Sequence, residues 1–233
     1  QSMTGEEAFN WLGSEYTSNA SVEGLENIPK DGKFLIVSNH PMGAADAIAL
    51  YHQIYPVRND LFFFANELFV YLLGAFHELL APVVWNKEKE THSASKVTLE
   101  RLSVFFGDDR PGIIFPSGRL SKLTFFGLWD RPWEKTPIAL AKKYNFPLIP
   151  VYVEGRNSWF FYFASYVNKQ LRDISQLNEL FNKREKEMSI KIGKPVNVYT
   201  LNDNTDIAIG QMRYKSCLLY TSPSQRDGSI SRM

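Results

Sequence analysis

A histidine and an aspartate six positions apart are the residues of this sequence best suited to catalysis. Residues 38–46 read SNHPMGAAD, with His40 and Asp46 on either side of a turn that contains Pro41 and Gly43. A carboxylate beside one imidazole nitrogen orients the ring and leaves the other nitrogen to take a proton from a hydroxyl group. These residue types predict a general base with its orienting acid and no evident protein nucleophile.

A structural explanation of the same two residues stands beside the catalytic one. A histidine after a strand can bond only to backbone, and an aspartate in the first turn of a helix can act only as a cap. The choice between the two explanations depends on what the rest of the chain places near the pair.

The two residues fall where a predicted strand passes into a predicted helix. Residues 34–37 are an apolar run typical of a buried strand, and residues 45–51 have a helical pattern. Other strands are predicted at 61–65, 81–86, 112–115, 147–153 and 189–192 (an edge strand), and other helices at 66–74, 93–106, 133–144 and 174–186. Alternating strands and helices predict a single α/β domain with a mixed, mostly parallel sheet flanked by helices. His40 then lies at the carboxyl end of a strand, where such folds bind ligands.

The ends of the chain differ from the predicted domain. Residues 1–19 predict an N-terminal amphipathic helix, and residues 20–214 the α/β domain itself. Residues 215–233 lose all periodicity and predict an irregular tail, with the character of non-native translated sequence.

The composition of the 233-residue chain excludes several classes of protein. The net charge of +1 gives no field that would favour nucleic acid. No apolar run is long enough for a transmembrane helix, and the first residues are acidic where a secretory signal would be basic. Cys217 is the single cysteine, so we expect no disulfide, no cysteine metal site and a cytoplasmic setting.

Three motifs together resemble one family. Residues 39–46 resemble the His/Asp motif of the glycerolipid acyltransferase superfamily, residues 115–121 (FPSGRLS) look like its FPEGTRS block, and residues 148–155 are similar to its later strand block with a central proline. Two departures, five residues between His40 and Asp46 (an HX5D motif) and Ser117 at the usual glutamate position, are similar to the branch of lyso-ornithine lipid acyltransferases and hemolysins.

The resemblance implies a glycerol-3-phosphate acyltransferase-like fold for residues 20–214 and an O-acyltransferase of lipid metabolism. The acyl donor would be a thioester of acyl carrier protein or coenzyme A, and the acceptor a lysolipid such as lysophosphatidic acid or lyso-ornithine lipid. His40 would be the general base and Asp46 its partner. Because a thioester is already activated, no metal and no further cofactor are expected.

The resemblance also implies a set of substrate-binding residues. These are Asn39, Pro116, Ser117, Gly118, Arg119 and, as a weaker candidate for a second basic contact, Lys87. A guanidinium at a strand end can grip a phosphate or carboxylate with two hydrogen bonds, and a glycine lets backbone N–H groups approach the same anion.

Two other classes of function stay open from the sequence. A serine hydrolase would use Ser117 as nucleophile and His40 as base, but Pro-Ser-Gly lacks the pattern of a nucleophile elbow. A non-catalytic, hemolysin-like lipid-binding protein would not need His40 and Asp46. The aromatic segments 68–73 and 159–163 fit either core packing or a lipid interface, and we expect a peripheral association with the inner face of the membrane.

Overall fold

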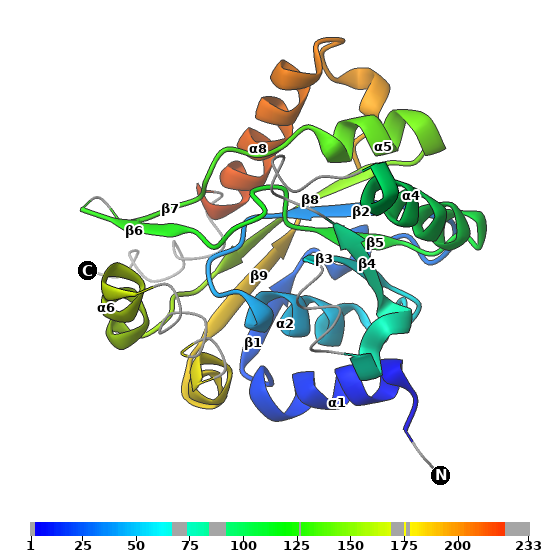
Figure 1. The fold of residues 1–233 in the computed structure, drawn as a ribbon. Coiled ribbons are helices and arrows are strands. Elements are labelled where there is room, and N and C mark those ends of the chain that lie inside the picture. The colour runs from blue at the N-terminus through cyan, green and yellow to red at the C-terminus, as the bar shows by residue number, and fades with distance from the viewer. Residues whose placement is uncertain are drawn as a thin grey trace, which may run out of the picture.

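The computed structural model describes residues 3–66, 74–83, 92–125, 127–168, 175 and 178–221. These residues form a seven-stranded sheet with helices on both faces (Figure 1), in the strand order β1-β9-β8-β2-β5-β3-β4. The strands are β1 (Ala20–Glu23), β2 (Leu35–Ser38), β3 (Phe62–Asn66), β4 (Leu80–Val83), β5 (Gly112–Ile114), β8 (Leu148–Glu154) and β9 (Met188–Ile192). Neighbours from β8 to β4 are parallel, β9 is antiparallel to β8, and β1 is parallel to β9. The predicted mixed, mostly parallel sheet is confirmed.

Two layers of helices cover the sheet. Helices α1 (Gly5–Tyr16) and α2 (Ala44–Ile54) lie on one face, and α4 (His92–Gly107), α5 (Thr136–Tyr144) and α8 (Thr205–Thr221) on the other (Figure 1). Helix α6 (Trp159–Val167) and the β6–β7 hairpin (Lys122–Thr124 and Gly127–Trp129) lie at the end of the sheet where β2 turns into α2. The short 3-10 helices are η1 (Leu25–Asn27), η2 (Gly74–Leu79), η3 (Asn182–Glu185) and η4 (Val198–Thr200).

Alternation along the central strand divides the core into the two layers. Phe34 and Ile36 pack with α1 and α2, whereas Leu35 and Val37 pack with α4, α5 and α8, and all four side chains are fully buried. A strand buried on both faces has a continuous apolar sequence, and residues 34–37 were predicted as a buried strand for this reason.

Several predicted elements need correction. The strand at 189–192 is not an edge strand, because β1, which the sequence analysis did not predict as a strand, lies outside it. The helix predicted from residue 133 begins at Thr136, with Pro137 in its first turn. The hairpin β6–β7 was not predicted. The predicted helix at 66–74 and the end of the strand predicted at 81–86 lie largely outside the described residues.

The chain does not become irregular at residue 215. Helix α8 continues to Thr221, and the buried hydroxyl of Ser216 donates a hydrogen bond to the carbonyl of Val151 in β8 at 2.6 Å. The sequence of residues 215–221 alone could not predict this contact, because Val151 lies 65 positions away in the chain. Across the described ranges, no helix is long and apolar enough to cross a membrane.

Candidate active site

The turn between β2 and α2 brings His40 and Asp46 together as predicted. Nδ1 of His40 lies 3.0 Å from Oδ2 of Asp46, whose side chain is fully buried. The N–H direction at Nδ1 does not meet the geometry of a hydrogen bond, so the carboxylate acts on the ring as a nearby charge. Oδ2 of Asp46 also accepts hydrogen bonds from the backbone N–H groups of Met42 (2.9 Å) and Gly43 (3.0 Å), which fix the carboxylate at the helix N-terminus.

The imidazole of His40 is held by its face and keeps one nitrogen open. The ring stacks on Phe115, with centroids 4.0 Å apart and planes 22° apart. The side chain is 19% exposed, and within the described ranges no group forms a hydrogen bond with Nε2. A ring packed by its face, with a carboxylate near one nitrogen and the other nitrogen open, suits the role of a general base.

Asn39, predicted to bind substrate, is engaged in joining two strands. Its side-chain amide donates to the carbonyl of Val153 at 2.8 Å and accepts from the N–H of the same residue at 2.7 Å. Asn39 therefore extends the pairing of β2 with β8 beyond the end of the strand and fixes where the turn begins. A role in substrate binding stays a prediction.

The loop from Pro116 to Ser121 follows β5 and lies beside the turn that carries His40, because the N–H of Ser121 donates to the carbonyl of His40 at 2.8 Å. Gly118 has φ +58°, a conformation that favours glycine, and its N–H donates a hydrogen bond to the carbonyl of Phe115 at 2.9 Å. The Arg119 side chain is exposed, and it forms no ion pair or hydrogen bond with any described residue. Such a guanidinium is available to an anionic ligand.

Among the described residues, the hydroxyl of Ser117 makes its hydrogen bond away from His40. Its hydroxyl donates to the carbonyl of Arg119 at 2.8 Å, a short-range bond that tightens the loop. A serine nucleophile needs a hydrogen bond to its base, so this geometry gives the hydrolase alternative no support. Pro116 is buried, and Lys87 lies outside the described residues.

Two polar clusters near the turn were missed by the sequence analysis. Asp130, after the β6–β7 hairpin, accepts hydrogen bonds from Ser121 and Trp133. The buried pair Lys183–Glu179 links η3 to the start of α6, because Oε2 of Glu179 lies 3.3 Å from Nζ of Lys183 and also accepts a hydrogen bond from the N–H of Ser158. Ser121 and Asp130 are nine positions apart and Ser158 and Glu179 are 21 apart, spacings that no local sequence pattern indicates.

Burial and mutual attraction act in opposite directions on the pKa values of Glu179 and Lys183. Burial raises the pKa of Glu179, but the hydrogen bonds from Ser158 and the charge of Lys183 outweigh it and hold that pKa below its usual value. Burial lowers the pKa of Lys183, which Glu179 and, more weakly, Asp46 counteract by raising it. Asp46 thus lies close enough to this cluster to affect it electrostatically.

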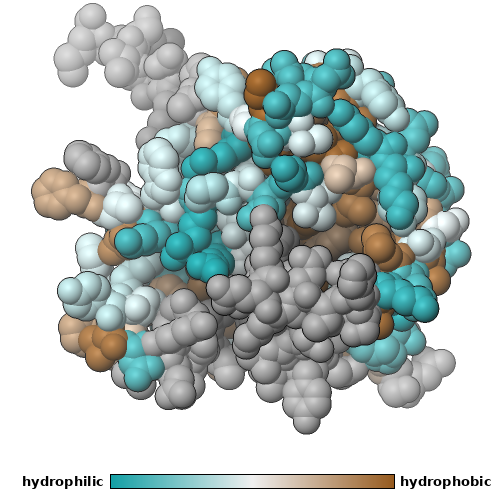
Figure 2. Space-filling view, turned by 45° about the horizontal axis from the view of Figure 1, so that its top comes forward, coloured by the Kyte–Doolittle hydropathy of each residue, from teal (hydrophilic) through white to brown (hydrophobic). Residues whose placement is uncertain are grey.

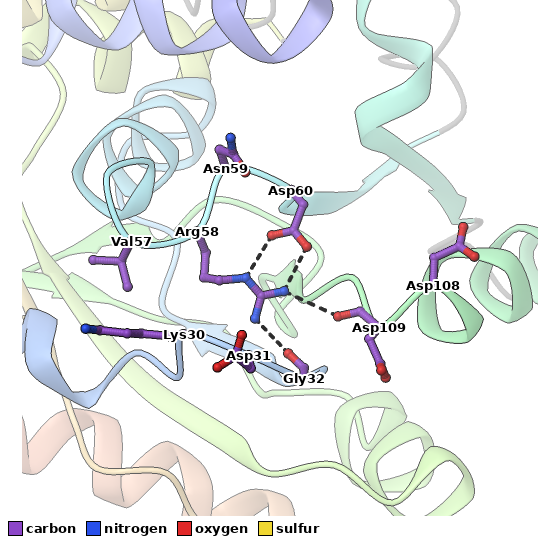
Figure 3. Close-up of a pocket in the computed structure, with 9 residues that line it drawn as sticks. All are labelled: Lys30, Asp31, Gly32, Val57, Arg58, Asn59, Asp60, Asp108 and Asp109. Carbon is purple, nitrogen blue, oxygen red and sulfur yellow. Dashed lines mark hydrogen bonds and ion pairs between the residues drawn. The ribbon is translucent and has the colours of Figure 1, made fainter.

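A cavity of about 370 Å³ lies at the other end of the parallel strands from His40 (Figure 3). It lies at the residues that precede β2, β3 and β5, the amino ends of parallel strands, where α/β folds do not usually bind ligands. Arg58 crosses it and donates to both oxygens of Asp60 and to the carbonyls of Gly32 and Asp109. Its guanidinium is occupied by these partners, so this region joins loops together.

The described residues bring no three His, Cys, Asp or Glu side chains together in a way that would hold a metal ion. At the carboxyl end of β2 the fold instead presents a histidine next to a buried carboxylate, and the adjoining loop carries the exposed Arg119. An α/β fold with titratable groups at this end of its parallel strands belongs to the class whose ligands bind there.

Comparison with known proteins identifies the family. Residues 7–221 match the model of the family described as "Acyltransferase". The chain is 32% identical over 186 residues to lyso-glycine lipid O-acyltransferases of Phocaeicola vulgatus and Bacteroides thetaiotaomicron, which covers 77% of this chain. The aligned part spans 64% and 66% of those relatives. The chain belongs to the acyltransferase family.

The fold agrees with a solved structure. The crystal structure of the 1-acyl-sn-glycerophosphate (LPA) acyltransferase PlsC from Thermotoga maritima superposes with a TM-score of 0.54 and 20% sequence identity. The superposition covers 93% of this chain and 76% of that one. The expected acyltransferase fold is thereby confirmed.

Proposed function

We propose that this protein transfers a fatty acyl group from an acyl thioester to the hydroxyl of a lysolipid, with His40 as the general base. The observation that carries the proposal is the turn after β2, where Asp46 lies 3.0 Å from Nδ1 of His40 and Nε2 stays open. Membership of the acyltransferase family supports acyl transfer, and the lyso-glycine lipid O-acyltransferase relatives support a lysolipid acceptor.

The proposed reaction needs no protein nucleophile. Nε2 of His40 takes the proton of the acceptor hydroxyl as its oxygen attacks the thioester carbonyl, and Asp46 stabilises the imidazolium that forms. The carbon–sulfur bond then breaks, and the departing thiolate takes the proton from His40. A positioned base of this kind contributes about 10²–10⁴ in rate.

We propose that the acceptor carries an anionic head group, held by Arg119. A free guanidinium on the loop beside the His40 turn offers two parallel hydrogen bonds to a carboxylate or a phosphate. A glycine-type head group supplies a carboxylate, and a lysophosphatidic acid supplies a phosphate. The donor, acyl carrier protein or coenzyme A, supplies only the activated carbonyl to this mechanism.

We also propose that α6 rests on the membrane surface. Three aromatic side chains of the nine-residue helix α6 face solvent: Trp159 is 73% exposed, Phe160 66% and Phe163 67%. In Figure 2 a few hydrophobic side chains protrude at the left margin, among pale and hydrophilic ones. Aromatic side chains of this kind suit the lipid interface. The other predicted aromatic segment, 68–73, lies outside the described residues.

An acceptor panel tests the proposed activity. The purified protein is given palmitoyl-CoA or palmitoyl-acyl carrier protein, with lyso-glycine lipid, lyso-ornithine lipid or lysophosphatidic acid, and the product esters are measured by mass spectrometry. We expect an ester that requires both thioester and acceptor, and acceptors with an exposed carboxylate or phosphate should react best. Thioester hydrolysis that is independent of every acceptor would contradict transfer.

Vesicle co-sedimentation tests the proposed surface. We expect wild type to sediment with phosphatidylglycerol/phosphatidylethanolamine vesicles, and the variant Trp159→Ser/Phe160→Ser/Phe163→Ser to remain in the supernatant. Tyr199→Ser, which removes an aromatic ring in η4 that is 62% exposed, is the control and should sediment like wild type. Equal sedimentation of all three proteins would contradict the proposal that α6 binds the membrane surface.

A further inference from the structure

Asp130 is a half-buried carboxylate beside the candidate site that the proposed mechanism does not use. One carboxylate oxygen accepts a hydrogen bond from the hydroxyl of Ser121 at 3.0 Å, and the other accepts from the indole N–H of Trp133. Ser121 and Trp133 are both buried, so these bonds are partly sheltered from water. Because each oxygen already has a donor from the protein, the carboxylate is better suited to holding structure than to binding a ligand.

Ser121 links Asp130 directly to the catalytic turn. While its hydroxyl bonds to Asp130, its backbone N–H donates to the carbonyl of His40 at 2.8 Å. A single residue therefore joins the turn that carries His40 to the segment that carries Asp130. Loss of the bond at Asp130 would free the side chain of Ser121 and loosen this end of the loop.

The rest of the loop is fastened to the same segment. Nε of Arg131 donates to the carbonyl of Leu120 at 3.3 Å, and the N–H of Glu134 donates to the carbonyl of Pro116 at 3.0 Å. Residues 130–134 thus run along the outer side of the loop that carries Arg119, while the His40 turn holds its inner side.

Asp130 is itself anchored from the far side of the fold. Nη2 of Arg213 in α8 donates to the backbone carbonyl of Asp130 at 2.7 Å, and its guanidinium lies 5.6 Å from the ring centroid of Trp129. Burial raises the pKa of Asp130, which the bonds from Trp133 and Ser121, the charge of Arg213 and the charge of His40 counteract.

We propose that Asp130 is a positioning residue for acceptor binding: by holding Ser121 and Trp133 it fixes the 116–121 loop, and with it Arg119, at the distance from His40 that the acceptor head group requires. This inference rests on the proposed function, since it concerns the acceptor of that reaction. It assigns Asp130 no contact with the substrate.

A double-mutant cycle with kinetics tests the proposal. Initial rates are measured for wild type, Asp130→Asn, Arg119→Ala and the double variant, with palmitoyl-CoA and the best acceptor of the panel each varied in turn. The asparagine is isosteric but replaces one acceptor oxygen with an NH₂ group, which faces a donor. Thr124→Ala is the matched control, because it removes a side-chain hydrogen bond within the neighbouring hairpin.

We expect Asp130→Asn to raise the acceptor KM about tenfold and to leave the donor KM within about twofold, as expected when one hydrogen bond to a charged group is lost. In the Arg119→Ala background the same substitution should change the acceptor KM by less than about threefold, because the two residues act through one loop. Thr124→Ala should leave both KM values unchanged.

Hydrogen exchange of the peptide covering residues 116–121 gives a readout that does not depend on turnover. We expect faster exchange in Asp130→Asn and wild-type exchange in Thr124→Ala. Unchanged exchange, or an unchanged acceptor KM in an active enzyme, overturns the proposal, and so do additive effects of Asp130→Asn and Arg119→Ala. A wild type that makes no ester overturns the proposed function instead, and the positioning role in that reaction falls with it.

Discussion

The two ends of the parallel strands use their polar side chains in opposite ways. At the amino ends, Arg58 donates to Asp60, Gly32 and Asp109, and only 8% of this arginine is exposed (Figure 3). At the carboxyl ends, Nε2 of His40 and the guanidinium of Arg119 have no hydrogen-bond partner in the described ranges. Satisfied groups join loops, whereas oriented but unsatisfied groups are available to a ligand. The cavity beside Arg58 therefore lies at the end where side chains join loops, and the groups open to a ligand lie at the other end.

The largest expected effect is on activity, at the carboxyl end. Asp46→Asn removes the charge 3.0 Å from His40, and we expect kcat to fall by about 10²–10⁴ because the imidazolium loses its stabilising partner. Steady-state kinetics measures the fall, and circular dichroism checks the fold. Activity within about threefold of wild type would mean that His40 works without its carboxylate.

The buried Glu179–Lys183 pair refines the comparison, because its two charges are paired with each other. Lys183→Met leaves Glu179 buried without its cation, and we expect a loss of about 3–5 kcal/mol in the free energy of unfolding. Urea unfolding measures the loss. The double variant Lys183→Met/Glu179→Gln is the control and should recover a large part of it; a single variant as stable as wild type would show that the pair is not buried in solution.

A smaller loss of stability is expected at the amino end. Arg58→Lys keeps the charge but cannot make the two parallel bonds to Asp60 or reach both backbone carbonyls, which should cost about 1.5–3 kcal/mol. The kcat of the folded variant should equal that of wild type, as measured by thermal unfolding and kinetics on the same sample. A lower kcat with unchanged stability would reverse the roles assigned to the two ends.

The smallest effect is on the pH dependence of stability. Burial raises the pKa of Asp130 above its ordinary 3.8, so the folded protein holds this proton where the unfolded chain has lost it. The stability from protonated Asp130 is full below the unfolded pKa and is lost as pH rises through the raised folded pKa. The free energy of unfolding of wild type minus that of Asp130→Asn should therefore fall from about pH 4 to pH 7. A difference that rises with pH would contradict the direction of the shift.

Local features of the fold and site were predictable, and contacts across the fold were not. The strand before His40 is a continuous apolar run, and His40 and Asp46 are six positions apart, so a single turn brings them together. By contrast, β1 alternates half-buried and exposed residues and gains its place only by pairing with β9. Asp130 and Ser216 likewise owe their roles to partners elsewhere in the chain, which spacing does not reveal.

The most direct test of the central claim is ester formation by His40→Ala and Ser117→Ala. Initial rates are measured with a thioester donor, with and without lysolipid acceptor. The account predicts that His40→Ala loses acceptor-dependent ester formation by at least about 10², whereas Ser117→Ala retains substantial activity because its hydroxyl bonds only to Arg119. Loss of all activity in Ser117→Ala, with an acyl-serine trapped in the wild type, would contradict direct transfer and establish covalent catalysis.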